Sequence, residues 1–340
     1  MFLTMQAIDR SLASALALGI GLFATGAPGD QPPAASEPEW PRFTLKAEWT
    51  VPVNLPRGER FDASGLLWTA DGNLLMVSDR GPTLYRVQLR PDRQSADVIP
   101  LKDCFTPGQL ARWPRPADRP LDCEGIAQDA QGRLYLCEEA NRWILRCDPR
   151  SNLVERLAID WSPVTNYFSA DPNASFEGLA IGDGRLYVAN ERSAPVIISL
   201  DLASLKIVDR FVVIPQKPNL FGTHYSDLAW WDHRLFVLCR QQQVVLEVEP
   251  RSRTVLAEFD YGALETQLGY SALNVVGLME GLAVNGEFFW LAIDNNGLAR
   301  RHPPNDARPV LLKCPRPKPA GPAAGRPGVA NPPPPARLAR

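Results

Sequence analysis

Acidic residues recur at the start of short apolar segments in this chain of 340 residues. Glu124, Glu177 and Glu280 each precede a glycine and an apolar run, and Asp227 precedes a similar run. Other acids follow the next apolar run. Carboxylate oxygens without neighbouring His or Cys suit a hard cation such as Ca²⁺, which takes about six to eight oxygen ligands. The acids expected to hold calcium are Asp79, Glu124, Glu139, Glu177, Asp227, Glu280 and Asp294.

Arginines stand near these acids in the sequence. Arg80 follows Asp79 directly, and Arg192 and Arg240 occupy similar positions after apolar runs. Arginine can bind an anion through two parallel hydrogen bonds. We therefore expect an anionic substrate to be bound by Arg80, Arg142, Arg192 and Arg240. The alternative is that these arginines neutralise the acids in structural ion pairs.

Five segments of the chain repeat one pattern. They begin at Ser64, Glu124, Glu177, Asp227 and Glu280, so their starts are separated by 60, 53, 50 and 53 residues. Each combines an apolar strand, a turn such as Asp71-Gly72, a second apolar strand and two further short strands. Four antiparallel strands per repeat of about 50 residues are typical of a propeller blade.

The repeats therefore predict an all-β fold, a β-propeller with five four-stranded blades and a domain over 43–314. Inserts near 103–121, 161–175 and 262–278 leave six blades as an alternative. A strand at 43–51 is expected to pair with the last blade and close the ring. The first strand of every propeller blade lines a central channel, so the opening acids are expected to meet at one mouth.

Both ends of the chain have compositions unlike the repeats. Residues 1–27 carry an apolar stretch that is short for a membrane span and predict a signal peptide, with an uncleaved anchor as the alternative. Residues 28–42 predict a flexible linker, and 315–340 a disordered, Pro-rich basic tail. The expected location is secreted or periplasmic, with no stable membrane span after cleavage.

The balance of charge argues against a nucleic-acid partner. Lys and Arg number 36 and Asp and Glu 38, so the formal net charge is −2, whereas nucleic-acid binders are clearly basic. We expect a monomer that acts on a small-molecule ester or phosphate. Trp230 and Trp231 suggest a carbohydrate platform, although tryptophans in an inner strand and its turn more often pack.

The six cysteines show no metal-binding spacing. An even number in an exported chain permits disulfides. Cys104 and Cys123 bracket a Pro-rich loop and are the preferred pair, whereas Cys137 and Cys147 flank one predicted hairpin and are the alternative.

The repeat beginning at Glu124, EGIAQDAQGRLYLCEEANRWILRCD, resembles a blade of the β-propeller phytases. SGLLWTADGNLLMVSDRGP and SFEGLAIGDGRLYVANE likewise resemble motifs of the broader phytase-like family, described as having esterase-like activity. The resemblance implies a secreted propeller with calcium at the channel mouth, held at Glu124, Glu139 and Glu177. It departs from the phytases in having only six lysines, where those enzymes have a strongly cationic pocket.

These features support three functions. The first is a calcium-dependent hydrolase of phosphate or other esters. The second is a calcium-dependent lactonase, to which Asn190, Asn295 and Asn296 at strand ends could contribute ligands. The third is a non-catalytic propeller scaffold that binds a partner or surface ligand. The sequence shows no nucleophile elbow, phosphate-binding loop, zinc-protease motif or dinucleotide fingerprint in the repeats.

Overall fold

Short apolar runs separated by polar turns fold into antiparallel strands that pair in chain order. The computed structural model describes residues 40–54, 60–114, 121–171, 173–192, 194–269, 277–301 and 303–317. The predicted signal peptide, residues 28–39 of the predicted linker and residues 318–340 of the predicted tail lie outside the described residues. Among the described residues, no helix has the length and apolar character needed to cross a membrane.

The first two repeats each form a four-stranded antiparallel unit. The first unit contains β3 (Ala63–Trp68), β4 (Leu74–Ser78), β5 (Gly81–Leu89) and β6 (Ala96–Pro100). The second contains β7 (Cys123–Gln128), β8 (Leu134–Glu138), β9 (Trp143–Asp148) and β10 (Leu153–Arg156).

The third and fourth units repeat this order. The third contains β11 (Phe176–Gly182), β12 (Arg185–Asn190), β13 (Val196–Asp201) and β14 (Ile207–Phe211). The fourth contains β15 (Tyr225–Trp231), β16 (Arg234–Cys239), β17 (Val244–Glu249) and β18 (Thr254–Asp260).

The fifth unit combines the two ends of the described chain. It contains β19 (Met279–Val284), β20 (Phe288–Ile293), β21 (Val310–Pro315) and β2 (Trp49–Asn54). β2 pairs antiparallel with β21, in a register that places Trp49 opposite Lys313. Since β2 precedes the first unit in the sequence and completes the last one, it closes the ring, as predicted.

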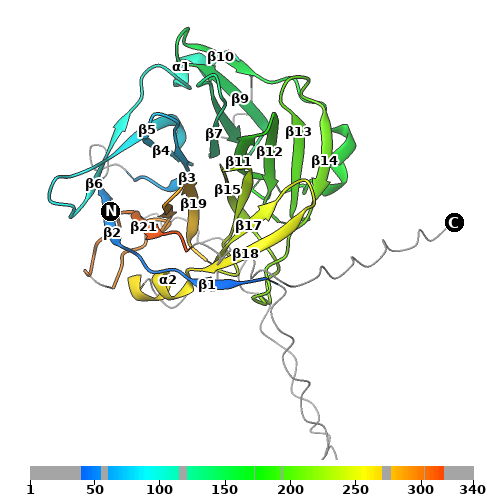
Figure 1. Cartoon of the computed structure of the whole chain (residues 1–340). Helices are drawn as coiled ribbons and strands as arrows, with labels where there is room; N and C mark the ends of the chain where they lie inside the picture. Colours follow the sequence, from blue (N-terminus) through cyan, green and yellow to red (C-terminus); the bar gives the residue numbers. More distant parts are fainter. Residues whose placement is uncertain are drawn as a thin grey trace, which may run out of the picture. The chain divides into compact units, whose positions relative to one another are not determined.

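The predicted closing strand at 43–51 is wrong in one respect, because the chain breaks it into two. β1 (Arg42–Thr44) pairs in parallel with β18, at the outer edge of the fourth unit (Figure 1). The chain then crosses to the fifth unit, where Glu48 N donates to Lys313 O at 2.7 Å. One segment thereby covers the exposed edges of two neighbouring sheets.

The inner strands β3, β7, β11, β15 and β19 contact one another in that order, and β19 contacts β3. The fold is therefore an all-β propeller, in agreement with the prediction. Within the described residues the strands form five antiparallel groups of four, with β1 added to the fourth group. A short parallel pairing of β2 with β6 joins the fifth group to the first. The three inserts contain described helices instead of strands: α1 (Pro107–Leu110), the 3₁₀ helix η3 (Ser162–Tyr167) and α2 (Gly262–Leu268).

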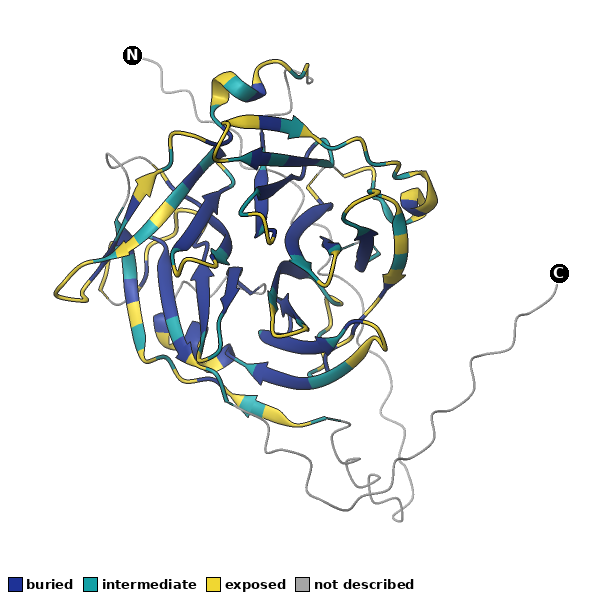
Figure 2. Ribbon diagram, turned by 45° about the horizontal axis from the view of Figure 1, so that its top comes forward, coloured by how far each residue is buried: buried dark blue, intermediate teal, exposed yellow. Residues whose placement is uncertain are grey.

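Apolar side chains fill the spaces between neighbouring units. Five clusters of buried residues each join two units in the ring, as in the packing of β16 against β20 through Phe236 and Phe289. In Figure 2 the inner strands are buried along most of their length, whereas outer strands alternate between buried and exposed residues. This packing fixes the inner strands around the axis.

Four inner strands carry a glycine where their backbones meet at the axis: Gly65, Gly125, Gly178 and Gly281. A Cβ on Gly125 would lie only 2.5 Å from Leu179 N, and one on Gly178 only 2.6 Å from Leu228 N. Contact with the next unit therefore leaves no room for a side chain at Gly125 or Gly178.

The fourth unit places Asp227 at the glycine position. Asp227 pairs with Leu238 after a register shift, just as Gly178 pairs with Ala189. The opening residue of this unit is therefore Ser226, one residue earlier than the sequence comparison placed it.

The structure contradicts the predicted Cys104–Cys123 disulfide. Cys104 bonds to Cys147, whereas Cys123, Cys137, Cys239 and Cys314 are free and buried. Cys123 lies in the inner strand β7. Cys104 lies in the insert after β6 and packs against β9, the third strand of the second unit, which contains Cys147. The alternative Cys137–Cys147 pair is also excluded, because the β8–β9 register places Cys147 opposite Leu134.

Candidate functional site

One end of the central channel opens into a polar cavity of about 480 Å³, which we call the acidic mouth. The starts of the inner strands supply Ser64, Glu124, Glu177 and Glu280. Residues that follow the second strands supply Asp79, Glu139 and Asp294. The structure thus brings together every acid predicted to hold calcium except Asp227.

Strand irregularities help to place the opening residues in this cavity. The pairing of β7 with β8 shifts between Cys123 and Ile126, and that of β11 with β12 shifts between Phe176 and Gly178. Such bulges re-aim a side chain at the end of a strand. They therefore explain how buried strands can present Glu124 and Glu177 to the channel.

Two overlapping groups of carboxylates lie at the acidic mouth, and all their members except Glu191 line the cavity. Asp122, Glu124 and Glu139 make one group, and Glu139, Glu177 and Glu191 make the other, with one oxygen from each residue lying within 4.8 Å of the others in its group. Glu139 belongs to both groups and accepts a hydrogen bond from Ser175 N at 3.0 Å. Glu124 accepts one from the Ser64 hydroxyl.

The electrostatics of these acids disfavour several negative charges without a cation. Burial is the main cause that raises the pKa of Glu124 and Glu177 well above the ordinary value, and nearby carboxylates raise both further. Burial likewise raises the pKa of Glu139 to about 8. An all-oxygen donor set with this excess of acid fits a hard cation such as Ca²⁺.

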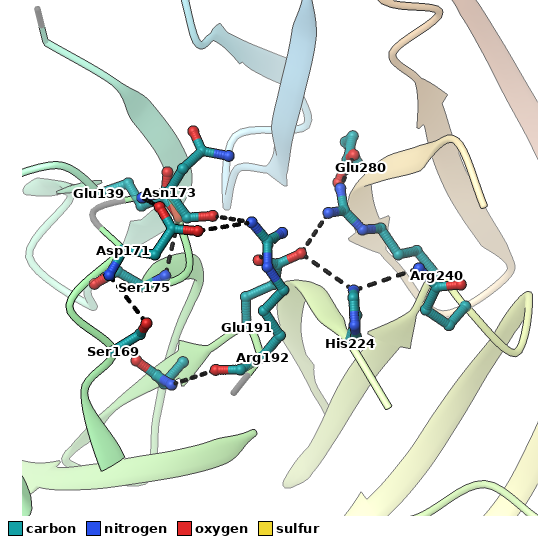
Figure 3. A network of polar contacts seen from close by, with 12 residues as sticks. Glu139, Ser169, Asp171, Asn173, Ser175, Glu191, Arg192, His224, Arg240 and Glu280 are labelled. Atoms are coloured by element: carbon teal, nitrogen blue, oxygen red, sulfur yellow. Dashed lines mark hydrogen bonds and ion pairs between the residues drawn. The ribbon is translucent and has the colours of Figure 1, made fainter. Parts of the chain in front are cut away.

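Arg240 forms the cationic wall of the acidic mouth. Its guanidinium donates to Glu191 and to Glu280, joining the third and fifth units (Figure 3). Burial raises the pKa of Glu280 to about 8 in spite of this arginine. Glu280 Oε2 is buried and has no hydrogen-bond partner among the described residues, which leaves this oxygen open to a ligand.

Glu191 differs from the other acids because two arginines and a histidine surround it. Arg192 Nη1 lies 2.6 Å from Glu191 Oε2, and His224 Nδ1 lies 3.4 Å from Glu191 Oε1 (Figure 3). Burial would raise the pKa of Glu191, but the His224 hydrogen bond and the charges of Arg240 and Arg192 together lower it. Glu191 is therefore held as a charged ion-pair partner.

The opposite wall contains Asp62, which sequence reasoning missed. Asp62 accepts from both Arg60 and Arg80, and Arg80 Nε lies 3.4 Å from Asp79 Oδ1. Burial raises the pKa of Asp79 to about 7 and that of Asp294 to about 6. The structural ion pairs weighed in the sequence analysis thus exist on this wall and around Arg240.

Three predicted residues do not line the acidic mouth. Asp227 is fully buried, and its carboxylate accepts from the backbone nitrogens of Leu66, Leu228 and Leu282. Its role is structural because it lies at the glycine position, where backbones converge.

Arg142 and Arg192 lie outside the cavity wall as well. Arg142 donates to Ser169 O at 2.7 Å and covers the Phe168 ring. Arg192 pairs with Glu191 and donates to Asn173 O. Of the four predicted substrate arginines, Arg80 and Arg240 line the acidic mouth.

The acids that were missed share a sequence signal. Asp62 and Asp122 stand two residues before the opening residues Ser64 and Glu124, at one position of the repeat. Asn173 and Asn296 also line the cavity. By contrast, Asn190 and Asn295 donate to backbone carbonyls and support loops.

Comparison with known proteins identifies the family. The family model described as "Phytase-like: Esterase-like activity of phytase" matches residues 61–297. This range is more than half of the chain, so the protein belongs to the phytase-like family, and the predicted resemblance is confirmed. None of the curated proteins searched matches the chain.

Two solved structures illustrate what the chain is similar to. The crystal structure of Myxococcus xanthus glutaminyl cyclase matches with a TM-score of 0.53 and 15% identity, covering 81% of this chain and 97% of that one. A PQQ-bound aldose sugar dehydrogenase from Streptomyces coelicolor matches with a TM-score of 0.44 and 14% identity, covering 80% and 97%. At this identity the glutaminyl cyclase supports the propeller fold alone.

Proposed function

We propose that the acidic mouth binds a calcium ion and that the protein hydrolyses a small phosphate ester or carboxylic ester there. The observation that carries this proposal is that Asp122, Glu124, Glu139 and Glu177 line one cavity, with oxygens of Glu139 within 4.8 Å of oxygens of the other three. Membership of a family described by esterase-like activity supports the same reaction class.

Asp122, Glu124, Glu139 and Glu177 would hold the ion. When bound, Ca²⁺ would polarise an ester oxygen and lower the pKa of a coordinated water. The Ser64 hydroxyl orients Glu124 through its hydrogen bond. Asp79, whose pKa burial raises to about 7, is suited to accept a proton near neutral pH.

Arg80 is the best-placed residue for an anionic substrate. Its side chain is 49% exposed, it lines the acidic mouth, and its partners Asp62 and Asp79 lie on the same wall. Arg240 is 15% exposed and engaged by Glu191 and Glu280. We therefore assign Arg240 to the positioning of these two acids, and Arg80 to the substrate.

The test is a calorimetric calcium titration of the full chain, followed by turnover assays with 4-nitrophenyl phosphate and 4-nitrophenyl acetate. Glu139→Gln should weaken calcium binding and turnover together. Glu287→Gln is the matched control, because Glu287 is exposed and does not line the acidic mouth. Calcium binding that survives Glu139→Gln unchanged would remove the assigned site.

The other predicted functions become outcomes of the same experiment. Calcium binding without ester turnover, but with lactone hydrolysis, would favour a lactonase. Calcium binding without turnover of any of these substrates would favour a metal-stabilised scaffold. The structure gives the lactonase less support, because Asn296 is the one predicted asparagine among the residues that line the described cavity.

We also propose that the protein acts after export. The Cys104–Cys147 disulfide suits an oxidising compartment, and residues 1–27 have the composition of a signal peptide. Amino-terminal sequencing of the protein from separated cell fractions tests this. An intact residue 1 on cytoplasmic protein would contradict it.

A further inference from the structure

The other end of the channel forms a second cavity, of about 330 Å³, which we call the apolar mouth. It is lined by the far ends of the inner strands, including Leu67, Trp68, Ile181, Trp230, Trp231 and Val284. The axial glycines and Asp227 lie between it and the acidic mouth. The apolar mouth has no part in the chemistry proposed above.

One tryptophan of the apolar mouth has an available face. Trp68 stacks on Trp290, and Trp230 stacks on Tyr187. Both are therefore packing residues, as weighed for Trp230 in the sequence analysis. Trp231 is 37% exposed and lies at the rim.

The turns around the apolar mouth carry exposed acids. The hairpins that join first and second strands present Asp71, Asp183, Asp232 and Glu287. The same hairpins also carry Arg133, Arg185 and Arg234, and Asp183 is paired with His233 and Arg251. Asp71, Asp232 and Glu287 form no ion pair among the described residues, and apolar side chains beside these three acids suit a ligand that is both apolar and basic.

The chain leaves the propeller beside this rim. β21 ends at Pro315, opposite Phe288, and Arg316 N donates to Glu287 O at 2.7 Å. The adjacent Gly286 lies against Trp231, since a Cβ on it would be 3.4 Å from the indole ring. The described chain thus ends at Pro317, one residue after Arg316, beside the hairpin that contacts Trp231.

The composition of this segment matches the apolar mouth. Residues 318–340 include seven prolines, four of them at 332–335, together with four Lys or Arg and no acid. Polyproline segments dock on grooves lined by aromatic rings and lose little entropy in doing so. The chain from 318 to 331 can extend over roughly 40 Å, ample to return to the rim.

We propose that residues 318–340 of the same chain dock on the apolar mouth, with the prolines at 332–335 against Trp231 and the basic residues facing the acidic rim. The tether favours this occupant over a free ligand, because short linkers give an effective concentration of the order of 1 mM. The protein would thereby cover its own exposed aromatic surface.

Hydroxyl-radical footprinting of the full chain tests the proposal. The variant replaces the four prolines together: Pro332→Ser, Pro333→Ser, Pro334→Ser and Pro335→Ser. A tail bound about four-fifths of the time would protect Trp231 about fivefold, so the variant should oxidise at Trp231 about five times faster. Phe221 is 57% exposed and does not line the apolar mouth, which makes it the internal reference.

A second variant tests the charges without touching the prolines. Asp232→Asn with Glu287→Gln should raise Trp231 oxidation in the same direction but by less, and added salt should remove most of the difference between this variant and the native chain. Both sites are exposed, so the fold is retained.

Three outcomes would overturn the proposal. Equally fast Trp231 oxidation in the native chain and the proline variant would show that the tail does not dock there. Equally slow oxidation in both would show that another occupant protects Trp231. Protection that disappears on dilution, with sedimentation showing a dimer, would assign the tail to a second copy and contradict docking within one chain.

Discussion

The acidic mouth and the apolar mouth are built from opposite ends of the same inner strands. At the acidic mouth, each inner strand opens with a polar residue, and a bulge turns four of them, Ser64, Glu124, Glu177 and Glu280, into the cavity. At the apolar mouth the strands end in residues such as Trp68, Ile181 and Trp231. A propeller repeat therefore separates polar and apolar chemistry by position along one strand.

The boundary between the mouths shows how this separation is maintained. Gly65, Gly125, Gly178 and Gly281 allow the backbones to meet, and Asp227 fills the fifth position with a carboxylate. That carboxylate bonds the first and fifth units through Leu66 N and Leu282 N. The axis is thus closed by backbone contact and by one buried acid, which divides the channel in two.

The largest expected effect comes from removing charge at the acidic mouth. Glu139→Gln with Glu177→Gln should weaken calcium binding by about 100-fold or more, since even outer-shell substitutions cost roughly 10- to 100-fold. Without calcium and above pH 8 the same variant should melt at a higher temperature than the native chain, because Glu139 loses its proton there and glutamine carries no charge. Calorimetry and thermal melts with chelator measure both.

The comparison with the apolar mouth supplies the control. Glu287→Gln removes one charge from the opposite rim and should leave the calcium affinity unchanged. If it weakened calcium binding as much as the acidic-mouth variant, the two mouths would not be electrostatically separate.

Asp227, which lies at the boundary between the two mouths, should stabilise the fold. Asp227→Ala leaves the backbone nitrogens of Leu66 and Leu282 without their acceptor, at a cost of about 3 kcal/mol in the free energy of unfolding. Ser226→Ala, which removes one hydrogen bond to Met279 O, should cost about 1 kcal/mol. Urea denaturation at fixed pH measures the difference. Equal losses would contradict the special role of Asp227.

The Cys104–Cys147 disulfide lines neither mouth and should affect stability without affecting calcium. Cys104→Ser with Cys147→Ser should lower the free energy of unfolding by about 2–4 kcal/mol. Thiol titration of the unfolded native protein should find four free thiols, those of Cys123, Cys137, Cys239 and Cys314. Six thiols, or a changed calcium affinity in the variant, would disagree with this assignment.

The smallest effect is that of pH on the acidic mouth. Since burial raises the pKa of Glu139 to about 8, it is mostly protonated at pH 7, and calcium binding must release its proton. One such proton makes calcium binding about fivefold tighter at pH 8 than at pH 7. Titrations in buffers of different ionisation enthalpy measure the proton release.

The raised pKa of Glu139 also determines whether the calcium-free protein gains or loses stability as the pH rises. A carboxyl group that binds its proton more tightly in the folded state stabilises the fold below its unfolded pKa. That contribution is lost as the pH rises through the folded pKa. The calcium-free protein should therefore lose stability between about pH 4.5 and pH 8. A melting temperature that rises over this interval would contradict the assignment.

Much of the acidic mouth was accessible from the repeat pattern, because residues at one position of a repeat come together around an axis. Glu124, Glu177 and Glu280 follow from that rule, and Asp62 and Asp122 could have been found two residues upstream. Asp227 was misplaced by one residue, since the sequence SDLA at 226–229 matches EGLA at 177–180 only if Asp227 takes the glycine position.

The sequence alone determined the propeller, the family and most of the acids, because repeat period, strand alternation and motif order are local properties. The tertiary structure decided which acids lie close together, which arginines neutralise them, and which cysteines bond. Those outcomes depend on contacts between units: Arg240 joins Glu191 to Glu280, and Cys104 reaches Cys147 across the boundary of two blades. Residues far apart in the chain make these contacts, and only closure of the ring brings them together.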